Sequence, residues 1–280
     1  MATLLLFGDS WANPCDGHPS WPEVLAEQLG WDSVNFAQPG SSSSNLVAQA
    51  RRFERAVELG QLEIDGDDEV WALVHTGGND LFYMPPARFL AVVGAGALDA
   101  LCCAMVERCS GPLLKDVCAN LRDFLDRIHE GVGISKVILV GVPITPTMPF
   151  VDNIIANMIG TWPGAVPLGH RIVRQVNASH VASLARVGGA FEYGSASKVA
   201  VCLDEAAAID AVMARRRRAA LRAVAAGKDG PVIKEGSGSG WADGSHPSAE
   251  LRVELAAELS AQLKRAMQHG AALGATTARI

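Results

Sequence analysis

The first 80 residues repeat one local pattern three times: an apolar run, a turn that contains glycine, and a stretch with helical spacing. The apolar runs cover residues 2–7, 34–37 and 69–75. A buried strand followed by a helix and another strand is the unit of a parallel sheet with right-handed crossovers. The repetition therefore predicts an α/β fold in which the loops after the strands gather at one edge of the sheet.

The remainder of the chain continues this pattern. A fourth strand is expected at 136–142 and a fifth at 190–193, with 199–203 extending or complementing it. Further helices are expected at 20–30, 45–59, 86–130 with a break at Ser110-Gly111-Pro112, 170–187, after residue 203, and from Pro247 onward. In the last helix an apolar residue recurs every four positions, which predicts the face that packs on the sheet: Leu251, Leu255, Leu259, Leu263 and Met267.

Composition favours one large domain. Of the 280 residues, 49% are hydrophobic but only 6% are aromatic, and glycine and alanine are plentiful. Such a composition suits helices packed closely on a sheet better than a β-sandwich. We expect a single domain over 1–269 and a frayed tail over 270–280. The four consecutive arginines at 215–218 point around most of a helix, which favours a solvated surface over an anion site.

Several classes of function are disfavoured. The formal net charge of −6 leaves no broad basic surface for nucleic acid. No apolar run reaches the roughly 18 to 20 residues that cross a bilayer, and the first strand leaves no room for a signal peptide, so a cytoplasmic protein without a membrane span is expected. The six cysteines are expected to be reduced, and no cysteine or histidine spacing indicates a zinc site.

The first apolar run ends at Gly8-Asp9-Ser10, which places the Ser10 hydroxyl at the sheet edge. Alone, this tripeptide is most often a turn. A serine becomes a nucleophile when a base takes its proton. The best candidate base is His246, because Asp243 lies three residues earlier and is able to fix the imidazole tautomer. The other histidines have weaker claims, and His75, inside a buried strand, is interpreted as a satisfied core histidine.

Two donors for a developing oxyanion follow neighbouring strands. Gly40 offers an unshielded backbone N–H, and Asn79 offers a side-chain amide. Each has a simpler structural interpretation, as a turn glycine and as a helix cap. Together with Ser10 and His246, however, they lie at the edge where open α/β sheets bind their ligands.

Four motifs occur along the chain in this order: Gly8-Asp9-Ser10, Gly40, Gly77-Gly78-Asn79-Asp80 and Asp243-Gly244-Ser245-His246. In order and spacing, they resemble the four sequence blocks of the SGNH, or GDSL, hydrolase superfamily of esterases and lipases. The resemblance extends from the first strand to the last helix, although 82–135 and 144–240 match poorly. It implies a flavodoxin-like three-layer α/β/α fold with a central, mostly parallel five-stranded sheet. It also implies that the protein needs no metal or cofactor.

The resemblance further implies a role for each matching residue. Ser10 would be the nucleophile, His246 the general base and later the acid, and Asp243 the residue that orients His246. The oxyanion hole would comprise the Ser10 N–H, the Gly40 N–H and the Asn79 side chain. The chain departs from the family pattern at Trp11, where leucine is frequent, which is expected to alter the pocket wall and leave the reaction unchanged.

The substrate is expected to be a small-molecule, lipid or sugar ester. Candidates for substrate contacts are Trp11, Asp80, Met158 and Trp162. The last two belong to the segment 144–169, which is rich in proline and methionine and is interpreted either as a lid or as an ordinary helix packed on the core. The sequence assigns no oligomeric state.

Three functions remain open within this resemblance: a serine esterase, an acyltransferase that passes the acyl group from Ser10 to an alcohol or sugar, and a non-catalytic binding module. Other classes lack their motifs. The Gly-x-Ser-x-Gly pentapeptide of α/β-hydrolases is absent, as are the histidine ligands of metallophosphoesterases. The glycine-serine stretch at 236–240 lacks the strand and the lysine of a phosphate-binding loop.

Overall fold

A computed structural model describes residues 2–14, 17–64, 69–82, 106–148, 151–152, 156, 161, 163–226, 241 and 246–277. Its centre is a parallel sheet with the strand order β2-β1-β3-β4-β5. The strands are β1 (Ala2–Gly8), β2 (Asp32–Asn35), β3 (Glu69–His75), β4 (Lys136–Val140) and β5 (Val199–Leu203). The parallel five-stranded sheet predicted from the sequence is thus confirmed.

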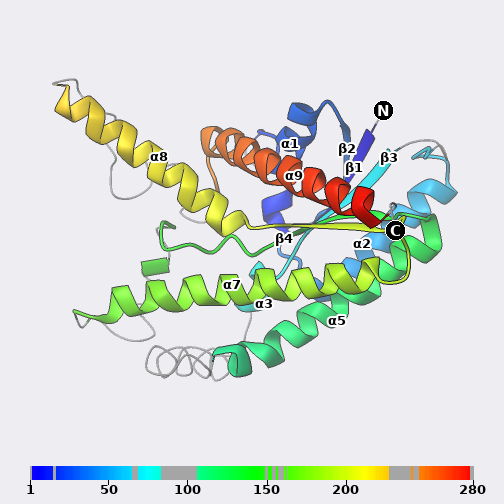
Figure 1. Cartoon of the computed structure of the whole chain (residues 1–280), viewed down its shortest axis with the longest axis horizontal. Coiled ribbons are helices and arrows are strands. Elements are labelled where there is room, and N and C mark those ends of the chain that lie inside the picture. The colour runs from blue at the N-terminus through cyan, green and yellow to red at the C-terminus, as the bar shows by residue number, and fades with distance from the viewer. Residues whose placement is uncertain are drawn as a thin grey trace.

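Helices cover both faces of this sheet (Figure 1). On one face lie α1 (Trp21–Leu29), α8 (Glu205–Ala225) and α9 (Ala249–Thr277). On the other lie α2 (Leu46–Glu58), α5 (Val106–Val132) and α7 (Ala165–Glu192). Three short helices lie at or near the carboxyl ends of the strands: η1 (Ser10–Ala12), η2 (Ser43–Asn45) and α3 (Gly78–Phe82).

The alternation of side chains along β1 divides the core into two layers. Leu4 and Leu6 belong to the cluster under α1, α8 and α9, whereas Leu5 and Phe7 belong to the cluster under α2, α5 and α7. All four side chains are fully buried. An apolar run without polar positions is what a strand covered on both faces requires, because each of its side chains meets a packed layer.

Local sequence signals set the ends of α1. The Glu23 carboxylate accepts a hydrogen bond of 2.7 Å from the Ser20 backbone N–H, which completes a capping box. The helix ends at Gly30, whose φ of 70° is left-handed and suits glycine. In α9, the predicted apolar face is buried from Leu251 to Leu263, but Met267 is 37% exposed.

Several predicted boundaries were wrong. The segment 190–193 does not form the fifth strand, because 190–192 complete α7 and Phe191 packs from that helix into the core. The fifth strand is Val199–Leu203, which pairs with β4. The break expected at 110–112 is absent, since α5 runs through it and packs along α2 and α7.

The end of the chain also differs from its prediction. The last helix begins at Ala249, two residues after Pro247, and continues to Thr277 where a frayed tail from residue 270 was expected. This segment contains several alanines, the residue with the highest helix propensity, which favours continuation of the helix.

The described parts of the segment 144–169 pack against the core. Met148 and Val151 are almost fully buried, and Ala165, where α7 begins, is in the same cluster as the sheet residues. Residues 149–150, 153–155, 157–160 and 162 lie outside the described residues. The lid therefore stays a prediction.

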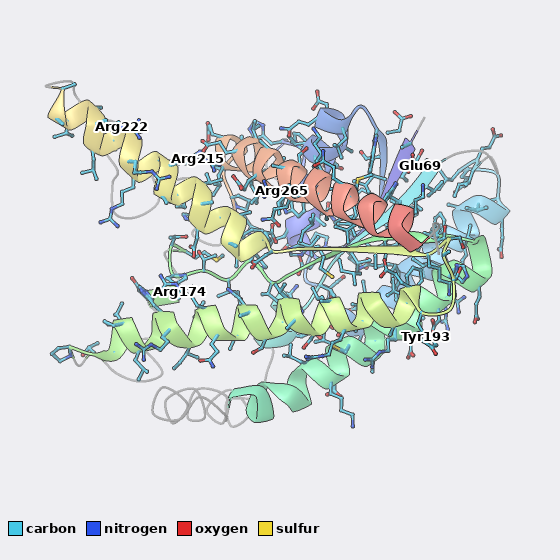
Figure 2. The ribbon with its side chains drawn as sticks, in the orientation of Figure 1. Glu69, Arg174, Tyr193, Arg215, Arg222 and Arg265 are labelled. Atoms are coloured by element: carbon cyan, nitrogen blue, oxygen red, sulfur yellow. The ribbon has the colours of Figure 1, made fainter. Side chains whose placement is uncertain are left out.

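The arginine run connects two helices on the surface. Arg215 and Arg216 of α8 pair with Glu258 and Glu254 of α9 at 2.6 and 2.7 Å (Figure 2 labels Arg215). Arg217 and Arg218 are exposed. This agrees with the predicted solvated face, and exposed pairs of this kind stabilise a protein only slightly. Across the part of the chain that the structure describes, no helix has the length and apolarity to span a bilayer.

Candidate active site

Ser10 is the first residue of η1, directly beyond the end of β1. The strand ends at Gly8 with φ 138°, where a Cβ would lie 1.9 Å from the carbonyl oxygen of His75 on β3. Only glycine permits this approach of the two strands. Asp9 then caps η1, because its Oδ1 accepts a hydrogen bond of 3.0 Å from the Trp11 backbone N–H.

The imidazole of His246 lies beside Ser10. His246 Nε2 is 2.9 Å from Ser10 Oγ, although the two residues are 236 positions apart. The indole of Trp11 is close to the same imidazole, with ring centroids 6.3 Å apart. The fold thus brings Ser10 and His246 together at the end of β1.

A buried arginine fixes the loop that carries His246. Arg252, on the first turn of α9, donates from Nε to the Pro247 carbonyl at 3.0 Å. Its Nη1 also donates to the carbonyls of His18 and Pro19, in the loop before α1. Arg252 is only 4% exposed. Arg252 was not among the residues predicted from the sequence, because nothing in the spacing connects position 252 with positions 18 and 19.

Gly40 occupies a tight turn beside the end of β1. The Ser41 N–H donates to the Gln38 carbonyl at 3.1 Å, and Gly40 has φ 73°. Proline at the second position and glycine with positive φ at the third are typical of a type II turn. The Gln38 N–H also donates to the Gly8 carbonyl at 3.0 Å, so this turn is attached to the strand that delivers Ser10.

Gln49 of α2 reinforces this attachment from a fully buried position. Its Oε1 accepts from the Gly8 N–H at 2.7 Å, and its Nε2 donates to the Gly8 carbonyl at 2.8 Å. The same Nε2 lies 3.2 Å from Ser41 Oγ. Gln49 therefore joins β1 to the Gly40 turn, and no local motif distinguished it from other helical glutamines.

Asn79 reaches the same loop from α3. Its Nδ2 donates a hydrogen bond of 2.7 Å to the Ser41 carbonyl, which uses one of the two amide hydrogens. Asp80, a candidate substrate contact, instead accepts hydrogen bonds from the N–H and Oγ of Ser43 at 2.8 and 2.6 Å. The Asn79 side chain thus lies beside the Gly40 turn, and Asp80 secures the loop around it.

The remaining site candidates divide into two groups. Trp11 is described, is mostly buried and lies next to the imidazoles of His75 and His246. Asp243, Met158 and Trp162 lie outside the described residues.

A buried chain of charged groups lies under Ser10. His75 Nδ1 is 3.1 Å from Asp9 Oδ1, and His75 Nε2 is 2.6 Å from Glu205 Oε2. Burial alone would lower the pKa of His75, but the negative charges of Glu205 and Asp9 and their hydrogen bonds raise it to about 10. His75 is thus a core histidine with satisfied nitrogens, as predicted, but it is also an imidazolium with two carboxylate partners.

A second buried histidine remains neutral. His180 of α7 accepts a hydrogen bond of 3.0 Å at Nδ1 from the Val142 N–H. Burial, together with the positive charge of His75, lowers the pKa of His180 to about 4. Within the described residues, no group of three or more histidine, cysteine, aspartate or glutamate side chains is arranged to hold a metal ion.

The arrangement brings together the groups that acyl transfer requires. The Ser10 hydroxyl lies within hydrogen-bond distance of the His246 imidazole, and the Asn79 amide of α3 lies beside the turn that contains Gly40. The model of the GDSL-like lipase/acylhydrolase family matches residues 6–191, which include Ser10, Gly40 and Asn79. The chain belongs to this family of SGNH hydrolases.

Solved structures provide further comparisons. The psychrotrophic esterase EstA from Pseudoalteromonas sp., in a structure inhibited by monoethylphosphonate, is 12% identical, with 96% of this chain and 100% of that chain covered and a TM-score of 0.43. A member of the lipolytic protein G-D-S-L family from Veillonella parvula is 14% identical, with 92% and 96% covered and a TM-score of 0.46. A comparison with curated protein sequences finds no match.

Proposed function

We propose that the protein is a serine esterase that hydrolyses carboxylic esters through an acyl-enzyme on Ser10. The observation that carries this proposal is the distance of 2.9 Å between His246 Nε2 and Ser10 Oγ. A serine hydroxyl is a weak nucleophile at neutral pH unless a base accepts its proton as it attacks. In the neutral imidazole with its proton on Nδ1, Nε2 is the acceptor that this step needs.

In the acylation step, Ser10 Oγ forms a bond to the ester carbonyl carbon while its proton moves to His246 Nε2. The carbonyl oxygen becomes an oxyanion. When the tetrahedral intermediate collapses, the bond to the alcohol oxygen breaks and His246 returns the proton to that oxygen. Water then attacks the acyl-enzyme by the same steps, which releases the acid and regenerates Ser10.

The oxyanion would be stabilised by three donors: the Ser10 N–H, the Gly40 N–H and the Asn79 amide. Support comes from how the loops are tied together. The Gly40 turn is bonded to Gly8 through Gln38, and Asn79 is bonded to Ser41. Donors held in place before reaction stabilise developing charge without the cost of reorganisation. Asp243 is proposed to orient His246.

The test combines covalent labelling with turnover. The purified protein is incubated with a fluorophosphonate probe and assayed with p-nitrophenyl esters of increasing acyl length, with and without an added alcohol. We expect labelling and hydrolysis in the wild type and loss of both in Ser10→Ala. Ser44→Ala is the matched control, because Ser44 is an exposed serine of the neighbouring loop.

The outcomes separate the three functions. Labelling that persists in Ser10→Ala would show that the nucleophile is another residue. A product ester that forms at the expense of free acid when alcohol is added would assign the protein as an acyltransferase. Absence of both label and turnover in the wild type would leave the binding module.

A further inference from the structure

The buried chain Asp9–His75–Glu205 joins three strand ends beneath Ser10. Asp9 follows β1, His75 is the last residue of β3, and Glu205 begins α8 just after β5. The side chains of all three are at most 3% exposed. The hydrogen bonds of 3.1 and 2.6 Å therefore form in a region of low effective dielectric, where charge interactions are strong.

Burial of a carboxylate without a partner is costly, and Glu205 has few partners. Among the residues that the structure describes, its Oε2 bonds to His75 and its Oε1 makes no hydrogen bond. The burial of Glu205 is therefore offset chiefly by its interaction with His75. Replacing such a group by an apolar residue is often neutral or stabilising, so stability alone is a weak reason for its presence.

At the other end of this chain of groups, Asp9 contacts the elements that present the site. Its Oδ1 accepts both from the Trp11 N–H and from His75, which fixes the first turn of η1. Its Oδ2 lies on the side of Gly78, 3.5 Å from the position of a Cβ there, at the start of the helix that carries Asn79. One carboxylate thus lies between the helix of Ser10 and the helix of Asn79.

The aromatic neighbours extend the contact to His246. The Trp11 indole stacks on the His75 imidazole, with ring centroids 6.1 Å apart and planes 2° apart. The same indole lies 6.3 Å from the His246 ring. One indole is therefore close to the imidazoles of both His75 and His246.

We infer that His75 is a positioning residue for the proposed reaction. His75 holds the turn of Ser10 through Asp9, and Glu205 holds His75. This inference rests on the proposed function. In this inference His75 acts through Asp9 and takes no part in the proton transfers of the proposed reaction. Its action is to keep the Ser10 N–H and Oγ in the geometry that attack and oxyanion stabilisation require.

The groups that face His75 come from several elements packed around it, and its two carboxylate neighbours support its charged state. Asp9 and Glu205 are its hydrogen-bond partners, and the rings of Trp11 and Trp21 pack against it. His180 of α7 also interacts electrostatically with His75, since the positive charge of His75 adds to burial in lowering the pKa of His180. Burial raises the pKa of the Glu205 carboxyl, and His75 opposes this effect, while the negative charges of Asp9 and Asp204 add to it.

The experiment uses Glu205→Gln, His75→Gln and the double variant. We expect Glu205→Gln to lower kcat about 10- to 100-fold with KM changed less than threefold, and to slow fluorophosphonate labelling of Ser10 by the same factor. His75→Gln leaves two buried carboxylates without a cation and is expected to be less stable. The double variant removes one of these charges, so it should be more stable than His75→Gln. Its kcat should be close to that of the more active single variant, which is a non-additive result.

A stability-matched control is available on the opposite face. Ile128→Ala creates a cavity on α5, in the core layer under α2 and α7, at a fully buried position. It should lower the unfolding temperature and leave kcat and the labelling rate unchanged. If Glu205→Gln and the double variant behave like Ile128→Ala, the chain of charged groups serves stability alone and the inference is wrong.

A second readout does not depend on catalysis. Nitrogen NMR of the His75 ring should show an imidazolium up to about pH 9. Hydrogen exchange of the Trp11 backbone N–H, which donates to Asp9, should accelerate in Glu205→Gln. If the wild type is not labelled by the fluorophosphonate and hydrolyses no ester, the proposed esterase function is wrong. The NMR and exchange signals can still be measured in that case. A neutral His75 ring at pH 7, or unchanged exchange at Trp11, would overturn the inference by itself.

Discussion

Ser10 and His246 show how a single hydrogen bond depends on several supporting residues. The 2.9 Å contact between them requires Gly8, where a larger residue would collide with the backbone of His75. It also requires Asp9, which caps the turn of Ser10. At this scale the sequence predicted that Ser10 and His246 lie at one edge of the sheet, because their types and order in the chain are informative. It did not predict Gln49 and Glu205, since buried residues that support a site have no local signature.

Asn79→Ala tests the proposed oxyanion hole. We expect kcat to fall by about 10² to 10³, with KM nearly unchanged, because a donor to the oxyanion acts mainly in the transition state. The measurement is steady-state hydrolysis of a p-nitrophenyl ester. Asn120→Ala is the control. Asn79 bonds to the loop after the Gly40 turn at Ser41, and Asn120 of α5 bonds to the same loop at Ser43 Oγ. A rise in KM with normal kcat would instead make Asn79 a substrate-binding residue.

At the scale of elements, the site is assembled by loops that are tied to one another across the sheet edge. The loop that carries His246 depends on Arg252, which bonds to three carbonyls from two loops. Apolar periodicity predicted the face of α9 up to Leu263, since burial of that face drives its packing. Periodicity did not distinguish 190–193 from 199–203 as the fifth strand, because short apolar runs suit either a helix or a strand.

Arg252→Met tests the connection between α9 and the His246 loop. Methionine keeps the apolar stem of the side chain but leaves the carbonyls of Pro247, His18 and Pro19 without their donor. We expect a loss of about 2 to 4 kcal/mol in the free energy of unfolding, measured with urea, because the hydrogen bonds involve a buried charge. We also expect kcat to fall about tenfold or more.

The control for this variant removes a surface cation from the adjacent helix. Arg215→Met breaks the exposed pair with Glu258 and should change stability by less than about 1 kcal/mol. Equal effects of Arg252→Met and Arg215→Met on stability and kcat would contradict a special role for Arg252.

At the scale of the whole molecule, two buried histidines in opposite charge states make stability depend on pH. His75 has a pKa of about 10 in the folded protein, above the ordinary value of 6.5. The contribution of His75 to the free energy of unfolding is therefore complete below about pH 6.5 and is lost as the pH rises toward 10. His180 has a pKa of about 4, below the same ordinary value, so its contribution is complete above about pH 6.5 and is lost as pH falls toward 4.

We therefore expect the free energy of unfolding to be highest near pH 6.5 and to decrease on both sides. Urea unfolding at pH values from 4 to 10 measures this profile. His75→Gln should flatten the alkaline side and His180→Gln the acid side. His129→Gln is the control, because His129 bonds to the Ile134 carbonyl at the far end of α5. A profile unchanged by both variants would show that neither histidine has the assigned charge state.

The overall architecture followed from repetition of strand, turn and helix, so the fold class was predictable from the sequence alone. The course of 144–169 was not, because its residues follow neither a strand nor a helix period. The described ends of that segment pack on the core, with Met148 and Val151 buried.

The proposal that Ser10 and His246 act as one catalytic unit is tested most directly by a double-mutant comparison. Turnover of an activated ester is measured for Ser10→Ala, His246→Ala and the double variant, each checked for folding by its unfolding temperature. If the two residues act together, each single variant loses about 10⁴- to 10⁶-fold in kcat, and the double variant loses little more. Losses that multiply in the double variant, or activity that survives in either single variant, would contradict the proposal.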